Sequence, residues 1–329
     1  MNAPKQKADN PPDSARVSRC LVTGGAGFIG SHTVDQLLAA GYEVAVLDNL
    51  SAGKEENVPE GVSLFVVDIT GDVSAPFAEF RPEVVVHLAA QTSVPASMAD
   101  PIYDARTNIL GSIELIRASV EFGVKKIVYA SSAAAYGPLD VLPLHEGLSP
   151  RPVSPYGASK YTVEHYLRAA FNELDLQWTA LRFANVYGPR QDPDGEAGVV
   201  AIFTALLFEG VSPTVFDDGE QTRDYVYVED VARALVHAVE RDFPRDGRVD
   251  PVFNVSTGVE TSVNVLLQEM NRALDTDIAA RYAPPRPGDV RRSVLDPTAA
   301  KKFLGWEAEV PTAEGLRRTL EFFRQRLDA

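Results

Sequence analysis

A glycine-rich turn between a strand-like and a helix-like segment constrains the fold of this chain more than any other feature. Residues 17–24 (VSRCLVTG) are typical of a short buried strand, and residues 31–41 (SHTVDQLLAAG) carry apolar side chains at helical spacing. Residues 42–49 (YEVAVLDN) form a second strand-like run, so the pattern predicts a βαβ unit. Three glycines lie at the first strand-to-helix turn, namely Gly24, Gly27 and Gly30.

This glycine spacing predicts a dinucleotide site. A pyrophosphate has to approach backbone N–H groups at a helix N-terminus, and a Cβ at the turn would block that approach. Asp48 ends the second strand, where a carboxylate can bind the ribose hydroxyls. We expect NAD as the cofactor, because a 2′-phosphate would meet the negative charge of Asp48. Lys54 is the one nearby cation in the sequence, and it keeps NADP open as an alternative.

The alternation of strands and helices continues beyond this unit. Further strand-like runs are residues 63–70, 82–90, 124–132 and 177–188, and residues 103–123 are typical of a long helix. This order predicts an α/β fold with a doubly wound parallel sheet, in which ligands bind beyond the carboxyl ends of the strands. Residues 214–240 are expected to run from a hairpin-like segment into a helix.

Composition narrows the class of partner and the compartment. The 329 residues carry a net charge of −15, so nucleic acid is not expected as a bulk electrostatic partner. No apolar run approaches the roughly 18 residues that span a bilayer, and the first residues lack the apolar region of a signal peptide. The one cysteine, Cys20, excludes an intrachain disulfide and fits a reducing compartment. We therefore expect a cytoplasmic protein without a membrane span.

A tyrosine and a lysine supply the candidate chemistry. Tyr156 and Lys160 are four residues apart on an expected helix and share one face. Tyrosine has a pKa of ~10, but an ammonium and a positive nicotinamide ring both favour the phenolate, which can then take a proton from an alcohol. Ser132, at the end of a strand, can share the substrate oxygen, so we expect Ser132, Tyr156 and Lys160 to be catalytic. His87 is expected to be structural, and no metal-ligand spacing is found at His145, His165 or His237.

Several longer motifs extend this pattern over nearly the whole chain. They are TGGAGFIG, LDNLSAGKEENV, VVHLAAQTSV, ASSAAAYG, SPYGASKYTVEHY, LRFANVYGPRQDP, DGEQTRDYVYVEDVA and PPRPGDVRRSVLD. In these motifs the chain resembles the extended short-chain dehydrogenase/reductase family, and within it the nucleotide-sugar 4-epimerases. The Pro, Asp, Asn and Lys content of residues 1–16 predicts a flexible tail. The strand–helix alternation and the shift in composition after about residue 188 predict an NAD-binding Rossmann domain (17–188, rejoined by about 224–257) and a nucleotide-sugar-binding domain (189–329).

The resemblance, together with the glycine turn, assigns two sets of binding residues. The expected cofactor contacts are Gly24, Gly27, Phe28, Ile29, Gly30, Asp48, Asn49, Ser51, Gly53, Asp68, Ile69, Leu88, Ala89, Ala90, Asn108, Ser131, Tyr156, Lys160 and Phe183. The expected contacts to a UDP-sugar are Ser132, Asn185, Val200, Phe216, Arg223, Arg286, Asp289 and Ser293. Arg223 and Arg286 are implied to bind the diphosphate, while Arg291 and Arg292 are expected at the surface or behind the site.

The residues after Ser132 distinguish reactions within the resemblance. Related 4,6-dehydratases carry Asp-Glu there, and UDP-glucuronate decarboxylases carry a Glu two residues later, whereas this chain has Ala133 and Ala134. Because alanine is neither acid nor base, the expected chemistry is oxidation at one carbon and its reversal. The resemblance therefore implies 4-epimerisation of UDP-hexoses through a transient 4-keto sugar. The small Ser293 further implies that UDP-N-acetylhexosamines are accepted.

Other interpretations stay open at this stage. They are another nucleotide-sugar enzyme of the family (a UDP-glucuronate epimerase or decarboxylase, or a dehydratase), a dehydrogenase that releases NADH, and a non-catalytic binding protein on the same fold. The chain departs from well-known hexose epimerases at Gln91, Thr92 and Ser93 and at Phe183. By resemblance, the helices expected over 103–122 and 156–174 pair with their copies in a homodimer.

Overall fold

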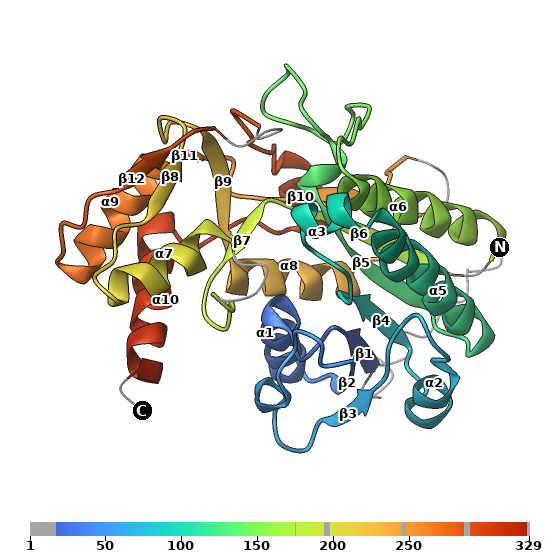
Figure 1. Ribbon diagram of the computed structural model, residues 1–329. Coiled ribbons are helices and arrows are strands. Elements are labelled where there is room, and N and C mark those ends of the chain that lie inside the picture. The colour runs from blue at the N-terminus through green and yellow to red at the C-terminus, as the bar shows by residue number, and fades with distance from the viewer. Residues whose placement is uncertain (1–17, 175, 194–197, 245–247, 286–289, 328–329) are drawn as a thin grey trace, which may run out of the picture.

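The computed structural model describes residues 18–174, 176–193, 198–244, 248–285 and 290–327. One sheet organises the larger of its two lobes (Figure 1). Its strands are β1 (Arg19–Thr23), β2 (Glu43–Asp48), β3 (Ser63–Val66), β4 (Val84–His87), β5 (Lys126–Ser132), β6 (Gln177–Phe183) and β10 (Val252–Val255). These seven strands are parallel and follow the order β10-β6-β5-β4-β1-β2-β3, which confirms the doubly wound α/β prediction.

Helices cover both faces of this sheet because its strands alternate between two cores. In β1, Cys20 and Val22 belong to one hydrophobic cluster and Leu21 to the other, as the two-residue period of a strand requires. The first cluster packs under α1 (Phe28–Ala39) and α8 (Val228–Glu240). The second packs under α2 (Ser74–Phe80), α5 (Gly111–Glu121) and α6 (Pro155–Glu173). The carboxyl ends of the strands are thus the part of the sheet open to a ligand.

The long helix predicted over 103–123 is divided in the structure. It consists of α4 (Pro101–Asp104), a π-helical turn (Ala105–Leu110) and α5. A π-turn widens the helix by one residue and is frequent at functional sites. Shorter elements complete the lobe, namely α3 (Val94–Ala99) and 3₁₀ turns at Glu55–Asn57 and Ala133–Ala135.

The smaller lobe has its own hydrophobic core, built on short strands and three helices. The strands are β7 (Asn185–Tyr187), β8 (Thr214–Phe216), β9 (Thr222–Tyr227), β11 (Glu260–Ser262) and β12 (Arg281–Ala283). The helices are α7 (Val199–Phe208), α9 (Val263–Leu274) and α10 (Thr312–Leu327). The predicted hairpin is wrong, because β8 pairs with β12 while β9 pairs with β7 and β11.

The chain returns to the large sheet after starting the smaller lobe. Helix α8 and strand β10 follow β9 in sequence, but they pack on α1 and pair with β6. A second π-turn (Ala300–Leu304) follows, and Trp306 then packs in the same core and donates from Nε1 to Asp230 O at 2.9 Å. The expected division at residue 188 therefore stays a prediction, since later segments interleave with the first lobe.

Candidate active site

The glycine turn leaves its backbone open at the carboxyl end of β1. Gly24 has φ +71°, and a Cβ there would lie 2.7 Å from the Ala89 nitrogen. A Cβ on Gly30 would lie 2.0 Å from the Gly24 oxygen, so only glycine lets α1 pack this closely. Gly27 caps α1 without a side-chain hydrogen bond. The turn therefore fits a pyrophosphate at a helix N-terminus, as NAD binding requires.

Asp48 lies beside this turn and is almost completely buried. Its Oδ2 accepts from Ala26 N at 3.0 Å and its Oδ1 accepts from Leu50 N at 2.9 Å. A Cβ on Gly53 would lie 2.9 Å from both carboxylate oxygens, so the glycine leaves room next to them. The Lys54 ammonium lies 3.2 Å from a carboxylate oxygen of Asp192. Lys54, on which the NADP alternative rests, thus forms an ion pair with Asp192.

The side chains beyond Asp48 form a hydrogen-bonded loop. Asn49 Nδ2 donates to Asp68 Oδ2 at 2.8 Å, and Ser51 Oγ donates to Asn49 Oδ1 at 2.7 Å. Burial would raise the pKa of Asp68, but hydrogen bonds from Thr70 and Asn49 outweigh it and hold that pKa below its usual value. Asp68 is therefore ionised at neutral pH, and its oxygens can accept from an amino group.

The predicted catalytic residues come together where β5 ends and α6 begins. Ser132 Oγ accepts from Ala134 N at 3.1 Å, which leaves its O–H able to donate. A Cβ on Gly157 would lie 2.4 Å from the Ala134 oxygen, so the first turn of α6, which carries Tyr156, packs directly on the turn after Ser132. Lys160 Nζ donates to Ala130 O at 2.9 Å and lies 5.9 Å from the centre of the Tyr156 ring. The structure thus brings Ser132, Tyr156 and Lys160 to one edge of the sheet.

Burial shifts the pKa values of Lys160 and of the groups around it. Desolvation lowers the pKa of Lys160 to about 8, although the charge of Asp104 raises it. Tyr129 lies 5.1 Å below the same ammonium, and burial raises its pKa well above the usual value. Tyr156 is only half-buried, whereas Tyr129 is 1% exposed. Of the two tyrosines beside the lysine, Tyr156 is the one presented to a substrate.

His87 has a structural role, as the sequence predicted. Ser112 Oγ donates to Asn108 O at 2.5 Å, so it accepts from His87 Nε2, 2.9 Å away. His87 Nδ1 then accepts from Thr23 Oγ1 at 2.8 Å, and Thr23 Oγ1 accepts from Ala89 N at 3.2 Å. Burial lowers the pKa of His87 to about 3, so the ring is neutral and its tautomer is fixed by its neighbours.

Part of the expected substrate set meets at the edge of the smaller lobe. Ser293 N donates to Thr222 O at 3.2 Å, which places Ser293 beside Arg223 on β9. Asn185 is exposed at the start of β7, opposite Tyr225 on β9. The chain after Ser293 contacts the loop that follows the turn at Ala133–Ala135, because Leu144 N donates to Val294 O at 2.8 Å. Phe216 ends β8. Arg286 and Asp289 lie outside the described residues.

Some predicted contacts lie in the cores or are used elsewhere. Val200 is 1% exposed in the core of the smaller lobe, and Ile69 and Phe183 are buried in the two cores of the larger lobe. Their side chains pack against apolar neighbours, and their predicted contacts to ligands stay predictions. Ser131 Oγ donates to Glu164 Oε1 at 2.6 Å. The remaining apolar positions, Phe28, Ile29, Leu88, Ala89 and Ala90, line the turn and the end of β4 and are partly exposed.

Comparison with known proteins decides the family. Residues 20–256 match the NAD dependent epimerase/dehydratase family. The chain belongs to this family. A UDP-glucose 4-epimerase from Mycolicibacterium smegmatis is 46% identical over 94% of this chain and 99% of its own. This epimerase-family chain also superimposes on two solved UDP-glucose 4-epimerases. The Thermotoga maritima enzyme with UDP-glucose gives a TM-score of 0.89 (49% identity, 94% and 99% coverage), and the Thermus thermophilus enzyme with NAD gives 0.87 (46%, 93% and 99%).

The sequence did not predict a buried ion pair that lies next to Ser132, Tyr156 and Lys160. Glu164 accepts from Arg182 Nε at 2.9 Å and from Arg182 Nη2 at 2.6 Å. The guanidinium lies 4.6 Å from the centre of the Tyr136 ring, and Tyr136 donates to Asn254 Oδ1 at 2.8 Å. The available signal was a polar residue on the core face of α6, since Glu164 lies one helical turn after Lys160 on the same face.

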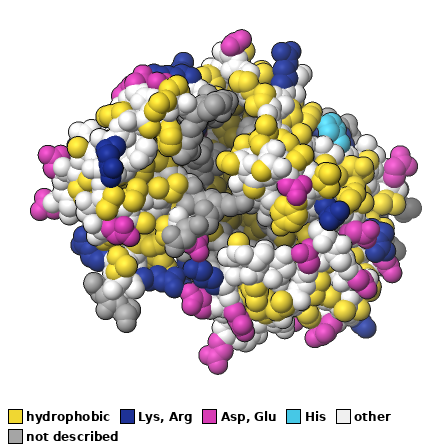
Figure 2. Space-filling view, viewed as in Figure 1, with side chains coloured by type: hydrophobic (Ala, Val, Ile, Leu, Met, Phe, Trp, Pro, Cys, Tyr) yellow, Lys and Arg dark blue, Asp and Glu magenta, His cyan; other side chains and the backbone are white. Residues whose placement is uncertain are grey.

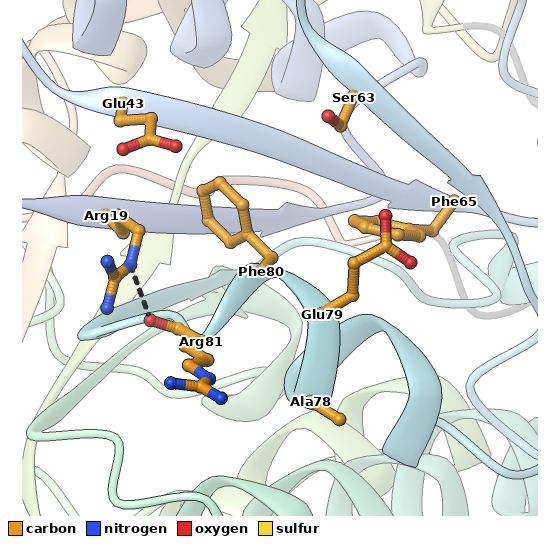
Figure 3. A pocket seen from close by; sticks show the side chains of 8 residues that line it. All are labelled: Arg19, Glu43, Ser63, Phe65, Ala78, Glu79, Phe80 and Arg81. Carbon is orange, nitrogen blue, oxygen red and sulfur yellow. Dashed lines mark hydrogen bonds between the residues drawn. The ribbon is translucent and has the colours of Figure 1, made fainter.

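One cavity of the described structure lies away from this chemistry. It has a volume of about 480 Å³ and opens at the amino-terminal ends of the first strands, where Figure 3 shows Arg19, Glu43 and Ser63 around it. The Arg19 guanidinium there donates to Arg81 O at 2.8 Å. In α/β sheets ligands bind at the opposite edge, so we assign the site to the carboxyl ends. Figure 2 shows the surface hollowed between the two lobes.

In the described part of the chain, no cluster of three or more His, Cys, Asp or Glu side chains could hold a metal ion. None of its helices is long and apolar enough to cross a membrane.

Proposed function

We propose that this chain is an NAD-dependent 4-epimerase that interconverts UDP-galactose and UDP-glucose through a transient 4-keto sugar. The observation that carries the proposal is the arrangement of Ser132, Tyr156 and Lys160 at the carboxyl edge, with Ala133 and Ala134 where an eliminating enzyme needs a carboxyl group. The UDP-glucose 4-epimerases that match almost the whole chain support the same reaction. NAD is supported by the open glycine turn and by the family.

The mechanism follows from the surroundings of each side chain. Residues of the glycine turn and Asp48 would hold NAD, and the chemistry that NAD supplies there is reversible acceptance of a hydride. The Lys160 ammonium, anchored by Ala130 O, favours the Tyr156 phenolate. The phenolate takes the proton of the sugar 4-hydroxyl while the hydride leaves the same carbon. Once the 4-keto sugar has turned over, Tyr156 returns the proton to its oxygen as the hydride returns to the opposite face of the carbon. The Ser132 hydroxyl donates to the sugar oxygen and keeps it in place.

The direct test uses purified protein without added cofactor. Incubation with UDP-galactose is expected to yield UDP-glucose, measured by chromatography, because the cofactor ends each cycle unchanged. Tyr156→Phe is the matched control and should yield none above background. A stoichiometric rise in NADH absorbance instead of an isomer would identify a dehydrogenase. No product from either UDP-hexose, even after NAD is supplied, would contradict the assignment.

We also propose that the sugar pocket admits 2-acetamido groups. The small Ser293 lies beside Arg223, and the residue after it contacts the loop that follows the turn at Ala133–Ala135. A large side chain there would fill the space next to the sugar. Ser293→Tyr is expected to lower the rate with UDP-GalNAc several-fold more than the rate with UDP-galactose. Equal loss with both sugars would remove the pocket argument.

We further propose a homodimer formed through the α3–α6 side of the larger lobe. Large apolar side chains are exposed on α3, α4, the π-turn and α6, which a monomer rarely leaves uncovered. They are Val94, Met98, Ile102, Tyr103, Leu110 and Tyr166. Light scattering is expected to give twice the mass of 35.7 kDa, and Ile102→Glu is expected to reduce it. Val66→Glu, an exposed apolar position on β3, is the control. A cytoplasmic location stays a prediction, to be checked by cell fractionation.

A further inference from the structure

A second set of polar side chains lies buried against the start of α6. Gln91, Asp104, Asn108 and Ser159 come from the loop after β4, from α4, from the π-turn and from α6, and they are 7%, 1%, 1% and 1% exposed. Asp104 Oδ1 accepts from Gln91 Nε2 and from Asn108 Nδ2, both at 3.0 Å. Gln91 N donates to Asn108 Oδ1 at 2.8 Å. One carboxylate thus joins two amides in a site that is almost completely buried.

This network continues into the first turn of α6, which carries Tyr156. Asn108 Nδ2 lies 3.1 Å from Ser159 Oγ, and Ser159 Oγ donates to Tyr156 O at 3.0 Å. Ser159 directly precedes Lys160, which is 3% exposed. The chain of contacts therefore runs from Asp104 to the backbone that carries both the tyrosine and the lysine.

Among the described residues, Asp104 is the carboxylate whose charge raises the pKa of Lys160. His87 faces the lysine from β4 and is neutral, and Tyr129 faces it from β5 as a protonated phenol. On α6 itself, Tyr156 is the reacting group, and the carboxylate of Glu164 is taken by Arg182. Asp104 Oδ2 is buried and has no hydrogen-bond partner in the described structure. An unpartnered buried oxygen is unfavourable, so this carboxylate is held in the cluster at a cost in stability.

We propose that Asp104 is a positioning residue that keeps the Lys160 ammonium charged and, through Asn108 and Ser159, fixes the turn of α6 that carries Tyr156. A buried ammonium loses the solvation that favours its charge, and a carboxylate in the same dry cluster offsets that loss. The proposal rests on the proposed function for its catalytic consequence. The electrostatic coupling itself holds whatever substrate the chain takes.

The pKa directions agree with this geometry. Burial lowers the pKa of Lys160 to about 8 while Asp104 raises it, and burial raises the pKa of Asp104 while Ser159, Lys160 and Gln91 lower it. Lysine is charged below its pKa. Removing the Asp104 charge therefore lowers the pKa of Lys160. The alkaline limb of the pH–rate profile then moves to lower pH.

The test measures the Lys160 pKa directly in the full-length protein with its NAD. The protein is labelled with ¹³C at the lysine ε-carbons, and the Lys160 signal is assigned by its loss in Lys160→Arg. Asp104→Asn keeps an oxygen that can accept from Gln91 and Asn108, and it should lower the Lys160 pKa by about one unit. Asp104→Ser, which removes the charge without adding volume, should give the same shift. Asp72→Asn removes an exposed carboxylate and should give none.

Activity is assayed on the same samples. The alkaline limb of kcat for UDP-galactose is expected to move to lower pH in Asp104→Asn by the shift that NMR shows, while Asp72→Asn follows the wild type. An unchanged Lys160 pKa in both Asp104 variants would overturn the inference, even with an active wild type. A shifted pKa in a protein that does not turn over UDP-hexoses would uphold the coupling and refute the proposed function instead.

Discussion

Replacing Glu164 by glutamine tests the buried ion pair beneath the catalytic helix. The native carboxylate accepts from Ser131 Oγ at 2.6 Å and from Arg182 Nε and Nη2 at 2.9 and 2.6 Å. The exposed fractions of the two charged side chains are 0% for Glu164 and 4% for Arg182. Glu164→Gln therefore leaves a guanidinium charge buried without its counterion.

The size of the effect follows from this burial. Removing one partner of a buried ion pair destabilises a protein by about 3–5 kcal/mol. An unfolding entropy of about 2.1 cal/mol/K per residue gives ~0.7 kcal/mol/K for a cooperative chain of 329 residues. We therefore expect the Tm of Glu164→Gln to lie about 4–7 °C below that of the wild type.

The assay is thermal unfolding followed by circular dichroism, with an exposed pair as the matched control. Arg168 and Asp250 are 2.7 Å apart but 35% and 59% exposed, so Asp250→Asn should change stability by no more than about 1 kcal/mol. The double variant Glu164→Leu with Arg182→Met, which removes both charges, should regain part of the loss. A Glu164→Gln protein that melts together with the Asp250→Asn control would refute the reasoning.

Three further predictions concern the site itself. Tyr156→Phe should lower kcat by about 10²–10⁴-fold while the bound NAD, measured after denaturation, stays at the wild-type level. Gly30→Ala, whose Cβ would lie 2.0 Å from the Gly24 oxygen, should purify without NAD or fail to fold, whereas Gly71→Ala, with 3.4 Å to its nearest atom, should keep the cofactor. The wild-type kcat should fall as pH rises through about 8, where the Lys160 ammonium loses its proton, and a profile that stays flat at alkaline pH would contradict this.

The parts of the site that sequence predicted are those fixed by local chemistry. The glycine turn, Asp48 and the Tyr156–Lys160 spacing each depend on neighbours close in the chain, and the structure brings each to the carboxyl edge. Ser132 was expected to be catalytic and Ser131 to contact the cofactor, and adjacent strand residues point to opposite sides. In the structure Ser131 turns to Glu164, and Ser132 caps the following turn.

What the sequence did not predict depends on contacts between distant segments. The hairpin at β8 and β9 failed because strand partners are set by the whole lobe and not by the local pattern. The pairing of Glu164 with Arg182, and of Asp104 with Gln91, joins residues on different elements. Polar residues on a helix face otherwise taken by core positions were the available signal, because a buried polar group implies a partner.

The return of the chain to the large sheet bears on how the protein emerges from the ribosome. A nascent chain that ends at β6 holds every residue of the glycine turn and of the triad, yet it lacks α8, β10 and Trp306. Without them β6 is an uncovered edge, and the part of the sheet face that α8 covers beside α1 is exposed. Cofactor capture during synthesis should therefore wait until the residues past 306 are outside the exit tunnel, so that the two lobes mature together and not in turn.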